Sequence, residues 1–315
     1  MRILLTGVTG QVGAALRAPL ECVGSVVAAD RTLLDLSRPE LVAATLDRIA
    51  PNLIVNPAAY TAVDRAEDER ELAFRVNGEA PGVIARWAAE RGVPLVHFST
   101  DYVFDGSGER PWCEDDPTCP LSVYGASKLA GEDAIHSAGG PHLIVRTSWI
   151  YAAVGTNFLR TIARLAGERE ELRVVADQTG APTSAHVIAD VVIAIVRRAN
   201  ADLSEAFHAS GGLINVAASG ETTWHGFATA IAEGLKVRGV SLRVQHVRPI
   251  RTQDYPTKAR RPANSRLDLT RLQRAFGIQT PRWEEALAVE LDRLAPALLG
   301  RRQASQAGVS RILME

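Results

Sequence analysis

The first residues of the chain combine a short apolar run with three glycines at a spacing of three. In ILLTGVTGQVGAAL, the apolar run predicts a buried strand, and Gly7, Gly10 and Gly13 lead directly into a helical pattern. Glycines in this setting permit a tight turn and let backbone N–H groups face a pyrophosphate at the positive helix N-terminus. A turn that merely lets the helix pack on the strand is the alternative. The strand–turn–helix context favours the dinucleotide site.

The first half of the chain alternates apolar runs with segments of helical spacing. Buried strands are predicted over residues 2–7, 25–30, 53–59, 94–100 and 142–149. Helices are predicted between them, over residues 11–21, 39–50, 68–92 and 122–139. Such alternation implies right-handed crossovers and a parallel sheet that helices cover on both faces. We therefore expect an α/β fold with a doubly wound (Rossmann) sheet.

The pattern loosens after residue 150. We expect helices over residues 156–168, 185–199, 222–239, 268–277 and 282–299, strand-like runs over 172–183 and 207–219, and a long Pro- and Arg-rich loop over 249–266. The predicted domains are a dinucleotide-binding domain (1–150, with 184–217 returning to it), a smaller substrate-binding α/β lobe (151–183 and 218–300) and a loosely held tail (301–315).

Composition excludes several classes of function. The 315 residues carry a net charge of −1 and 46% hydrophobic residues, with arginines scattered among carboxylates, so neither a nucleic-acid footprint nor a membrane-binding basic patch is expected. The apolar runs are too short for a leader peptide or a membrane span, which predicts a cytoplasmic protein. The three cysteines fit reduced thiols, and CEDDPTC has no zinc-type spacing, so no metal site is predicted.

One lysine occupies a special position in a chain that otherwise uses arginine. Only three of the 35 basic residues are lysines, and Lys128 follows Tyr124 by four positions in a helical stretch, so both project from one face. A nearby ammonium favours phenolate and lowers a tyrosine's pKa, which would make Tyr124 a usable proton donor to a carbonyl. The wider fork of arginine would not substitute equivalently. An exposed pair of helical neighbours is the alternative.

Polar residues follow the fourth predicted strand. Ser99, Thr100 and Asp101 come at its carboxyl end, where doubly wound sheets bind ligands. A hydroxyl group there can polarise a carbonyl and orient the tyrosine. A polar turn, common after any strand, is the alternative.

The second predicted strand ends at Asp30, the expected partner of the adenosine ribose hydroxyls. The neighbouring Arg31 complicates the choice of cofactor, because a carboxylate repels the 2′-phosphate of NADP whereas a guanidinium can hold it. Asp35 either lies by the adenine or caps a helix. The sequence therefore leaves NADPH and NADH both open.

These residues resemble those of the extended short-chain dehydrogenases/reductases. The resemblance runs from residue 1 to about 295, through GVTGQVG, NPAAYTAVDRAE, STDYVFDG, PLSVYGASKLAGE, RTSWIY, DQTGAPT, TTWHGFA and RPANSRL. The last four of these motifs lie from residue 146 onward, outside the general cofactor machinery. They point, within the family, to the branch that reduces C4 of dTDP-4-dehydro-β-L-rhamnose to give dTDP-L-rhamnose.

The resemblance implies roles for individual residues. Tyr124 would deliver the proton, Lys128 would hold the nicotinamide ribose and tune Tyr124, and Thr100 would bind the carbonyl oxygen. Asp101 and Trp149 would contact the sugar, although Trp149 also fits a core position at a strand end. The cofactor residues would be Gly10, Gln11 and Val12 at the pyrophosphate, Asp30, Asp35 and Leu36 at the adenosine, and Ala59, Tyr60 and Thr61 after the third strand.

The resemblance also bears on one departure from the family pattern, on the substrate phosphates, and on a metal and a dimer. Tyr60 replaces the histidine associated with this position and preserves its shape but not its ring nitrogens. Residues 249–266 would cover the nucleotide half of the substrate, with Arg260 or Arg261 at its phosphates. Some family members bind Mg²⁺ at a carboxylate-lined dimer contact. A homodimer is therefore compatible with the sequence, which carries no clear signature of the metal.

Two other functions compete with this one. A related epimerase or dehydratase is the first, but a dehydratase is expected to carry an Asp–Glu pair after the strand-end threonine, and here Thr100 is followed by Asp101 and Tyr102. The second is a non-catalytic subunit resembling the regulatory partner of methionine adenosyltransferase. Retention of Thr100, Tyr124 and Lys128 argues against lost catalysis.

Overall fold

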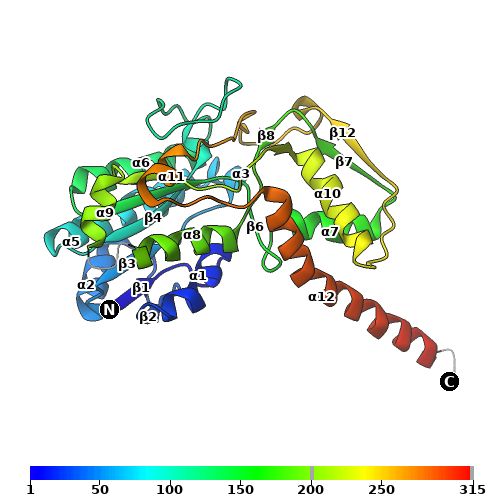
Figure 1. The fold of residues 1–315 in the computed structure, drawn as a ribbon, viewed down its shortest axis with the longest axis horizontal. Helices are drawn as coiled ribbons and strands as arrows, with labels where there is room; N and C mark the ends of the chain where they lie inside the picture. The colour runs from blue at the N-terminus through cyan, green and yellow to red at the C-terminus, as the bar shows by residue number, and fades with distance from the viewer. Residues whose placement is uncertain (199–201, 313–315) are drawn as a thin grey trace.

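A six-stranded parallel sheet forms the centre of the larger part of the molecule (Figure 1). The computed structural model describes residues 1–198 and 202–312, with side chains described up to residue 300. In the order in which they lie side by side, the strands are β10 (Leu213–Asn215), β5 (His142–Thr147), β4 (Leu95–Thr100), β3 (Leu53–Asn56), β1 (Arg2–Leu5) and β2 (Ser25–Ala28). All neighbouring pairs are parallel.

Helices cover both faces of this sheet because successive strand residues point to opposite sides. Ile3 and Leu5 of β1 belong to one buried cluster and Leu4 to another. The first cluster is closed by α1 (Gln11–Glu21), α8 (Ala185–Arg198), α9 (Leu203–Ala209) and α11 (Thr270–Phe276), and the second by α2 (Pro39–Ile49), α5 (Ala80–Glu90) and α6 (Val123–Ala138). The prediction of a doubly wound α/β sheet is confirmed.

A second, smaller core lies beside the sheet (Figure 1). It is built by β7 (Glu171–Val175), β12 (His246–Ile250), α7 (Phe158–Glu168), α10 (Trp224–Val237) and the first part of α12 (Trp283–Ile312). Two short ladders lie between the two parts: β6 (Ile150–Tyr151) pairs with β9 (Thr183–Ser184), and β8 (Thr179–Gly180) pairs with β11 (Thr222–Thr223).

The predicted helix over residues 68–92 is broken by a wider turn. It consists of α4 (Arg70–Phe74), the π-helical turn η1 (Arg75–Glu79) and α5, and a further short helix, α3 (Val63–Ala66), precedes it. Asn77 lies in the π turn. Its side-chain oxygen accepts a hydrogen bond of 2.8 Å from the backbone N–H of Tyr60, and its NH₂ group donates one of 3.0 Å to the carbonyl oxygen of Tyr60. π turns of this kind are frequent at functional sites. Here the turn aims Asn77 at the loop that follows β3.

Three predictions for the second half of the chain need correction. The run 207–219 is a strand only over β10, and α9, capped by Asp202, precedes it. The expected loop over 249–266 begins as β12, where Pro249 is tolerated because this strand pairs with β7 alone. The last predicted helix continues to Ile312, so the expected tail begins as helix, consistent with its Arg, Gln and Ala content. Residues 313–315 lie outside the described part.

No helix within residues 1–198 and 202–312 is both long enough and apolar enough to cross a bilayer.

Candidate active site

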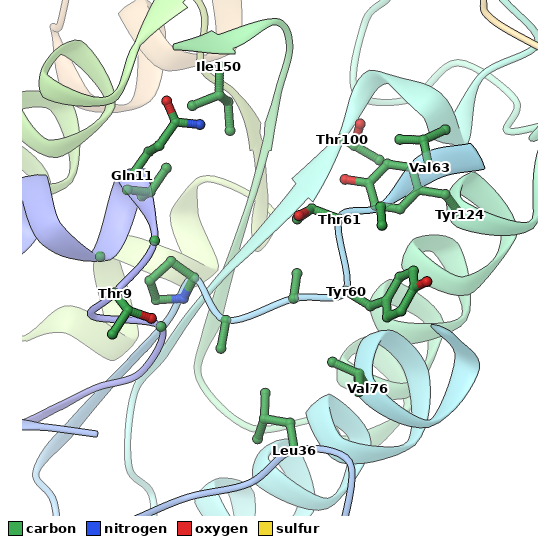
Figure 2. Close-up of a pocket in the computed structure, with 18 of the residues that line it drawn as sticks. Thr9, Gln11, Leu36, Tyr60, Thr61, Val63, Val76, Thr100, Tyr124 and Ile150 are labelled. Atoms are coloured by element: carbon green, nitrogen blue, oxygen red, sulfur yellow. The ribbon is translucent and has the colours of Figure 1, made fainter. Parts of the chain in front are cut away.

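A cavity of about 930 Å³ opens at the carboxyl ends of the central strands (Figure 2). Every residue that the sequence assigned to cofactor or substrate lines it, with the exception of Lys128 and the segment 249–266, which includes Arg260 and Arg261. Figure 2 shows Thr100 and Tyr124 side by side at one end, across from Thr9 and Gln11 of the glycine loop. The cavity size is at the upper end of the range for ligand sites.

The glycine loop has the shape of a phosphate cradle. Gly7 has φ of +57°, and a Cβ atom at this position would lie 2.8 Å from the backbone nitrogen of Ala58. At Gly13 a Cβ atom would lie 2.2 Å from the carbonyl oxygen of Gly7. Helix α1 starts at Gln11 without any side-chain cap, so its first N–H groups are available to an anion. The loop therefore fits a pyrophosphate.

Two carboxylates shape the adenosine end of the cavity. Oδ1 of Asp30 accepts hydrogen bonds from the hydroxyl (2.6 Å) and backbone N–H (2.9 Å) of Thr32, which lower its pKa. Oδ1 of Asp35 accepts hydrogen bonds in the same way from the hydroxyl (2.8 Å) and the backbone N–H (2.9 Å) of Ser37. These hydrogen bonds hold the pKa of Asp35 below its usual value. Both groups are thus anionic at neutral pH, and both line the cavity. Arg31 lines the same end of the cavity.

The loop after β3 is fixed from two sides. Asn77 holds the backbone of Tyr60, and the phenol of Tyr60 donates a hydrogen bond of 2.6 Å to Glu69. Burial and the Glu69 carboxylate raise the pKa of Tyr60, so its hydroxyl stays protonated. Ala59, Tyr60 and Thr61 therefore form a rigid wall of the cavity.

Tyr124 lies in the first turn of α6, which the Ser122 hydroxyl caps at 3.2 Å from the N–H of Gly125. The Tyr102 ring packs edge-on against the Tyr124 ring at 5.6 Å between centroids. Burial raises the pKa of Tyr124, the adjacent Thr100 hydroxyl acts in the opposite direction, and Asp101 and Tyr102 add to the increase. At neutral pH the tyrosine is therefore a protonated donor.

Lys128 does not act on Tyr124 as the sequence suggested. The residue is only 2% exposed, and its Nζ lies 3.2 Å from Nε2 of His97 on β4. Burial lowers the pKa of Lys128 to about 8, partly offset by Glu132. The prediction that the ammonium lowers the pKa of Tyr124 does not hold in this structure, because burial of the phenol dominates and Lys128 faces His97.

Several buried oxygen atoms without hydrogen-bond partners belong to the cavity that Tyr124 lines. They are Oδ2 of Asp101 and the hydroxyls of Ser99, Thr147 and Ser148, all from residues that line the cavity. Burial also raises the pKa of Asp101 to about 7. Unpartnered polar atoms at a cavity wall indicate a ligand that satisfies them. Sequence reasoning missed Thr147 and Ser148, although both stand in the RTSWIY motif.

Trp149 forms the wall between the two parts of the molecule. Its backbone has φ of +50°, rare for a bulky residue, and its ring stacks on Trp224 at 3.7 Å between centroids. Gly180 is needed beneath it, since a Cβ atom there would lie 2.6 Å from the indole. The half-buried ring lines the cavity and is not a core side chain.

The arginines predicted for the substrate phosphates lie outside this cavity. Arg261 pairs with Asp64 at 2.7 Å and contacts the Tyr102 hydroxyl at 3.3 Å, whereas Arg260 is exposed. Asp64 also accepts a hydrogen bond of 3.0 Å from the backbone of Ala259. The segment around Arg261 is therefore fastened to α3, directly beside Tyr102.

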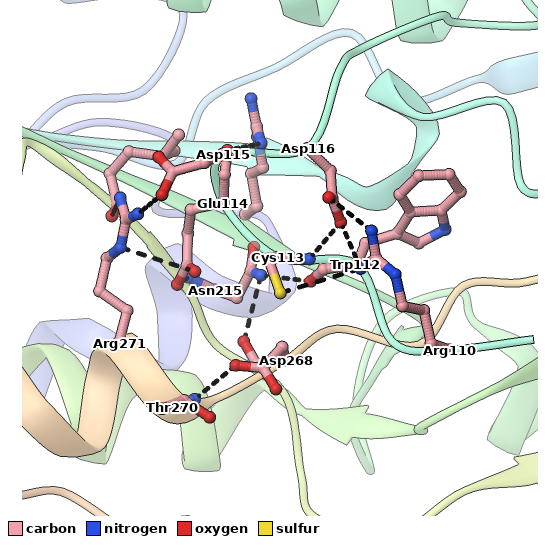
Figure 3. A network of polar contacts seen from close by, with 12 residues as sticks. Arg110, Trp112, Cys113, Glu114, Asp115, Asp116, Asn215, Asp268, Thr270 and Arg271 are labelled. Atoms are coloured by element: carbon pink, nitrogen blue, oxygen red, sulfur yellow. Dashed lines mark hydrogen bonds and ion pairs between the residues drawn. The ribbon is translucent and has the colours of Figure 1, made fainter.

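The CEDDPTC segment is a structural turn (Figure 3). Asp116 pairs with Arg110 at 2.7 Å and accepts a hydrogen bond of 2.7 Å from the backbone of Cys113. Oε1 of Glu114 accepts a hydrogen bond of 2.9 Å from the backbone of Asn215 on β10. Across the two described ranges, no cluster of three or more His, Cys, Asp or Glu side chains is arranged to hold a metal ion.

The fold and the site together define an oxidoreductase of the extended short-chain dehydrogenase/reductase class, since a dinucleotide cradle faces a tyrosine and a threonine hydroxyl across one cavity. The family model of the RmlD substrate binding domain matches residues 1–295. The chain belongs to that family.

Individual relatives agree with this membership. A dTDP-4-dehydrorhamnose reductase of Burkholderia thailandensis is 47% identical over 291 residues, which cover 92% of this chain and 97% of the relative. A dTDP-4-dehydrorhamnose reductase structure from Clostridium acetobutylicum is 34% identical with a TM-score of 0.84 and covers 93% of this chain and 99% of its own. A Bacillus anthracis dTDP-4-dehydrorhamnose reductase in complex with NADP has the same TM-score and coverage at 33% identity.

Proposed function

We propose that the chain reduces the C4 carbonyl of dTDP-4-dehydro-β-L-rhamnose to give dTDP-L-rhamnose, with NADPH or NADH as the reductant. The observation that carries this proposal is the pairing of a protonated Tyr124 with the Thr100 hydroxyl, opposite a pyrophosphate cradle. The relatives named dTDP-4-dehydrorhamnose reductase supply the substrate.

The reaction divides between cofactor and protein. A bound reduced nicotinamide supplies the hydride that C4 accepts. Thr100 and Tyr124 contact the carbonyl oxygen, and Tyr124 donates its proton as negative charge develops there. The unpartnered Oδ2 of Asp101 accepts a hydrogen bond from a hydroxyl group of the sugar. Trp149 provides an apolar face against the sugar ring. Lys128 holds the nicotinamide ribose.

The cofactor site supports both nicotinamide cofactors. Gly10, Gln11 and Val12 hold the pyrophosphate at the start of α1. Asp30 accepts from the ribose diol of NADH, whereas Arg31 beside it can hold the 2′-phosphate of NADPH. Asp35 and Leu36 lie at the adenine, and Ala59 and Thr61 flank the path to the nicotinamide.

The nucleotide half of the substrate would lie under residues 249–266. Arg261 is the better of the two predicted arginines for its phosphates, because Arg261 is half-buried beside Tyr102, and phosphate can replace Asp64 as its partner. We place the reaction in the cytoplasm, with a homodimer as the expected assembly. Sedimentation of the purified protein tests the assembly.

The two competing functions lack support at the site. A dehydratase needs a second carboxylate after Asp101, and Tyr102 packs there against Tyr124. A purely regulatory subunit has no need for a buried Lys128 one helical turn after a protonated tyrosine.

The decisive experiment follows the loss of reduced-nicotinamide absorbance when the protein is mixed with dTDP-4-dehydro-L-rhamnose and either NADPH or NADH. We expect oxidation of the cofactor and formation of dTDP-L-rhamnose in equal amounts. The control replaces the substrate by dTDP-L-rhamnose, which has no C4 carbonyl. The absorbance of the reduced cofactor should then stay constant. A folded protein that binds cofactor but oxidises neither one would refute the proposal.

A further inference from the structure

A chain of buried polar side chains runs beneath the site and ends at Lys128. His97 on β4 contacts Lys128 at 3.2 Å, and its other ring nitrogen, Nδ1, lies 3.1 Å from the side-chain amide of Asn56 on β3. Asn56 in turn bonds the hydroxyl of Thr6, just after β1, at 2.6 Å. All four side chains are at most 2% exposed. The chain thus crosses three neighbouring strands without contact with bulk water.

The hydrogen bonds of this chain have two consistent arrangements. With the Asn56 NH₂ group facing Nδ1 of His97, the imidazole proton lies on Nε2 and is donated to Lys128 as a neutral amine. With the Asn56 amide turned over, its oxygen accepts from Nδ1–H, and Nε2 accepts from Lys128 as an ammonium. The Thr6 hydroxyl rotates to suit either case. The same heavy-atom positions therefore serve both charge states of Lys128.

The charges around Lys128 place it near the balance between these states. Glu132, one helical turn further along α6, favours the ammonium, but its carboxylate is paired with Arg146 of β5 at 2.6 Å. Burial lowers the pKa of Lys128 and so opposes its ammonium form. Burial and the charge of Lys128 together keep the pKa of His97 well below its usual range. Towards the cavity lie the ionisable groups of Tyr124, Tyr102 and Asp101.

We propose that His97, backed by Asn56, is a positioning residue for the reaction: it stabilises Lys128 in both its charged and its neutral form. This inference rests on the proposed function, in which Tyr124 becomes a phenolate after each proton delivery. The charge on Tyr124, one turn earlier in α6, therefore changes within each cycle and favours the Lys128 ammonium in only part of it, so Lys128 must be held in both charge states. His97 is neutral in both states, with its hydrogen on Nδ1 when Lys128 is an ammonium and on Nε2 when Lys128 is an amine.

The low lysine content allows a direct test that needs no turnover. Protein labelled with ¹³C at the lysine ε-carbons gives three signals, and the exposed Lys236 and Lys258 serve as internal references for Lys128. The chemical shift of each signal is followed against pH in the wild type and in three variants. The Lys128→Arg protein identifies the signal of interest by its absence.

The variants have opposite expected effects. His97→Phe removes the acceptor of the ammonium, so the Lys128 titration should move down by about one pH unit or more. Asn56→Asp, nearly identical in shape, holds the proton on Nδ1 of His97 and keeps Nε2 an acceptor, so the titration should move up. Val96→Ala truncates a fully buried neighbour on the same strand and should lower the thermal midpoint without moving the titration.

A purely structural role for His97 predicts no downward shift of the Lys128 titration in His97→Phe, and this shift decides, because the added carboxylate of Asn56→Asp raises the titration by its charge alone. The inference is overturned if folded His97→Phe protein titrates like the wild type, or if Asn56→Asp shifts Lys128 downwards. Should His97→Phe fail to fold, His97→Gln decides instead: its side-chain oxygen can take the place of Nε2 as acceptor, so Lys128 should titrate as in the wild type, and a downward shift would overturn the inference. Absence of wild-type turnover would count against the proposed function alone, because the titration is measured without substrate.

Discussion

Gly13 offers the sharpest test of the phosphate cradle. A Cβ atom at this position would lie 2.2 Å from the carbonyl oxygen of Gly7, 2.6 Å from its carbonyl carbon and 3.0 Å from the nitrogen of Val8. These are backbone atoms, which cannot rotate away as the end of a side chain can. Non-bonded heavy atoms separate at about 3.5–4.0 Å, so the Gly13→Ala protein must move α1 away from the loop by roughly 1 Å.

The cost of this displacement falls on stability and on cofactor binding. Overpacking of this kind destabilises a protein by about 1–3 kcal/mol. A shift of about 1 Å also misaligns N–H groups with the pyrophosphate, and each hydrogen bond to a charged group is worth about 1.5–3 kcal/mol. Loss of one such bond weakens NADPH binding roughly tenfold to a hundredfold, since 1.4 kcal/mol corresponds to a factor of ten.

Titration calorimetry with NADPH and urea unfolding measure the two effects separately. Gly167→Ala is the matched control, because Gly167 lies inside α7 with open space at its Cβ position. That change should leave NADPH binding unaltered and stabilise the protein by about 0.5–1 kcal/mol. Wild-type NADPH affinity in the Gly13→Ala protein would refute the account of the cradle.

Three further predictions concern Tyr124 and Asp101 of the cavity wall and the buried ion pair of Glu132. Tyr124→Phe should lower kcat by about 10²–10⁴-fold in steady-state assays while the Kd for NADPH changes little, because only the proton donor is lost. Glu132→Gln leaves the buried Arg146 without its counter-charge and should lower the free energy of unfolding in urea by about 3–5 kcal/mol. Asp101 holds its proton more tightly when folded, since its pKa rises from 3.8 to about 7. The free energy of unfolding should therefore fall between about pH 4 and 7, by up to about 4 kcal/mol, and Asp101→Asn should remove this fall.

Each of these has a result that contradicts it. Substantial turnover by the Tyr124→Phe protein would assign the proton to another donor. Wild-type stability after Glu132→Gln would mean that the pair with Arg146 contributes nothing net. An identical pH dependence of unfolding in the Asp101→Asn protein would place the titration elsewhere.

The sheet and most of the cavity wall could be predicted because they depend on local order. Alternation of apolar runs and helical patterns implies parallel strands, and parallel strands bring their carboxyl ends to one edge. Gly7, Asp30 and Trp149 follow strands and Thr100 is the last residue of one, so the topology alone gathers them. Pro249 concealed a strand because a proline is tolerated at an edge, which the sequence cannot reveal in advance.

What escaped prediction depends on partners far apart in the chain. The π turn at Asn77 is coupled to Tyr60, 17 residues earlier, and to Ser127, 50 residues later. Lys128 was identified through its spacing to Tyr124, yet its side chain is oriented by His97, which stood in an apolar strand as one more buried residue. Spacing along a helix predicts a shared face but not the neighbour that the face meets.

The position of β10 has a consequence for how the protein is made. This edge strand of the main sheet comes from residues 213–215, whereas its neighbour β5 ends at residue 147. During synthesis the hydrogen-bonding edge of β5 therefore stays open while the ribosome adds roughly another 65 residues, which include α7 and β7. An open strand edge is a template for pairing with other chains. Nascent chains stalled between these two strands should be the most dependent on chaperones.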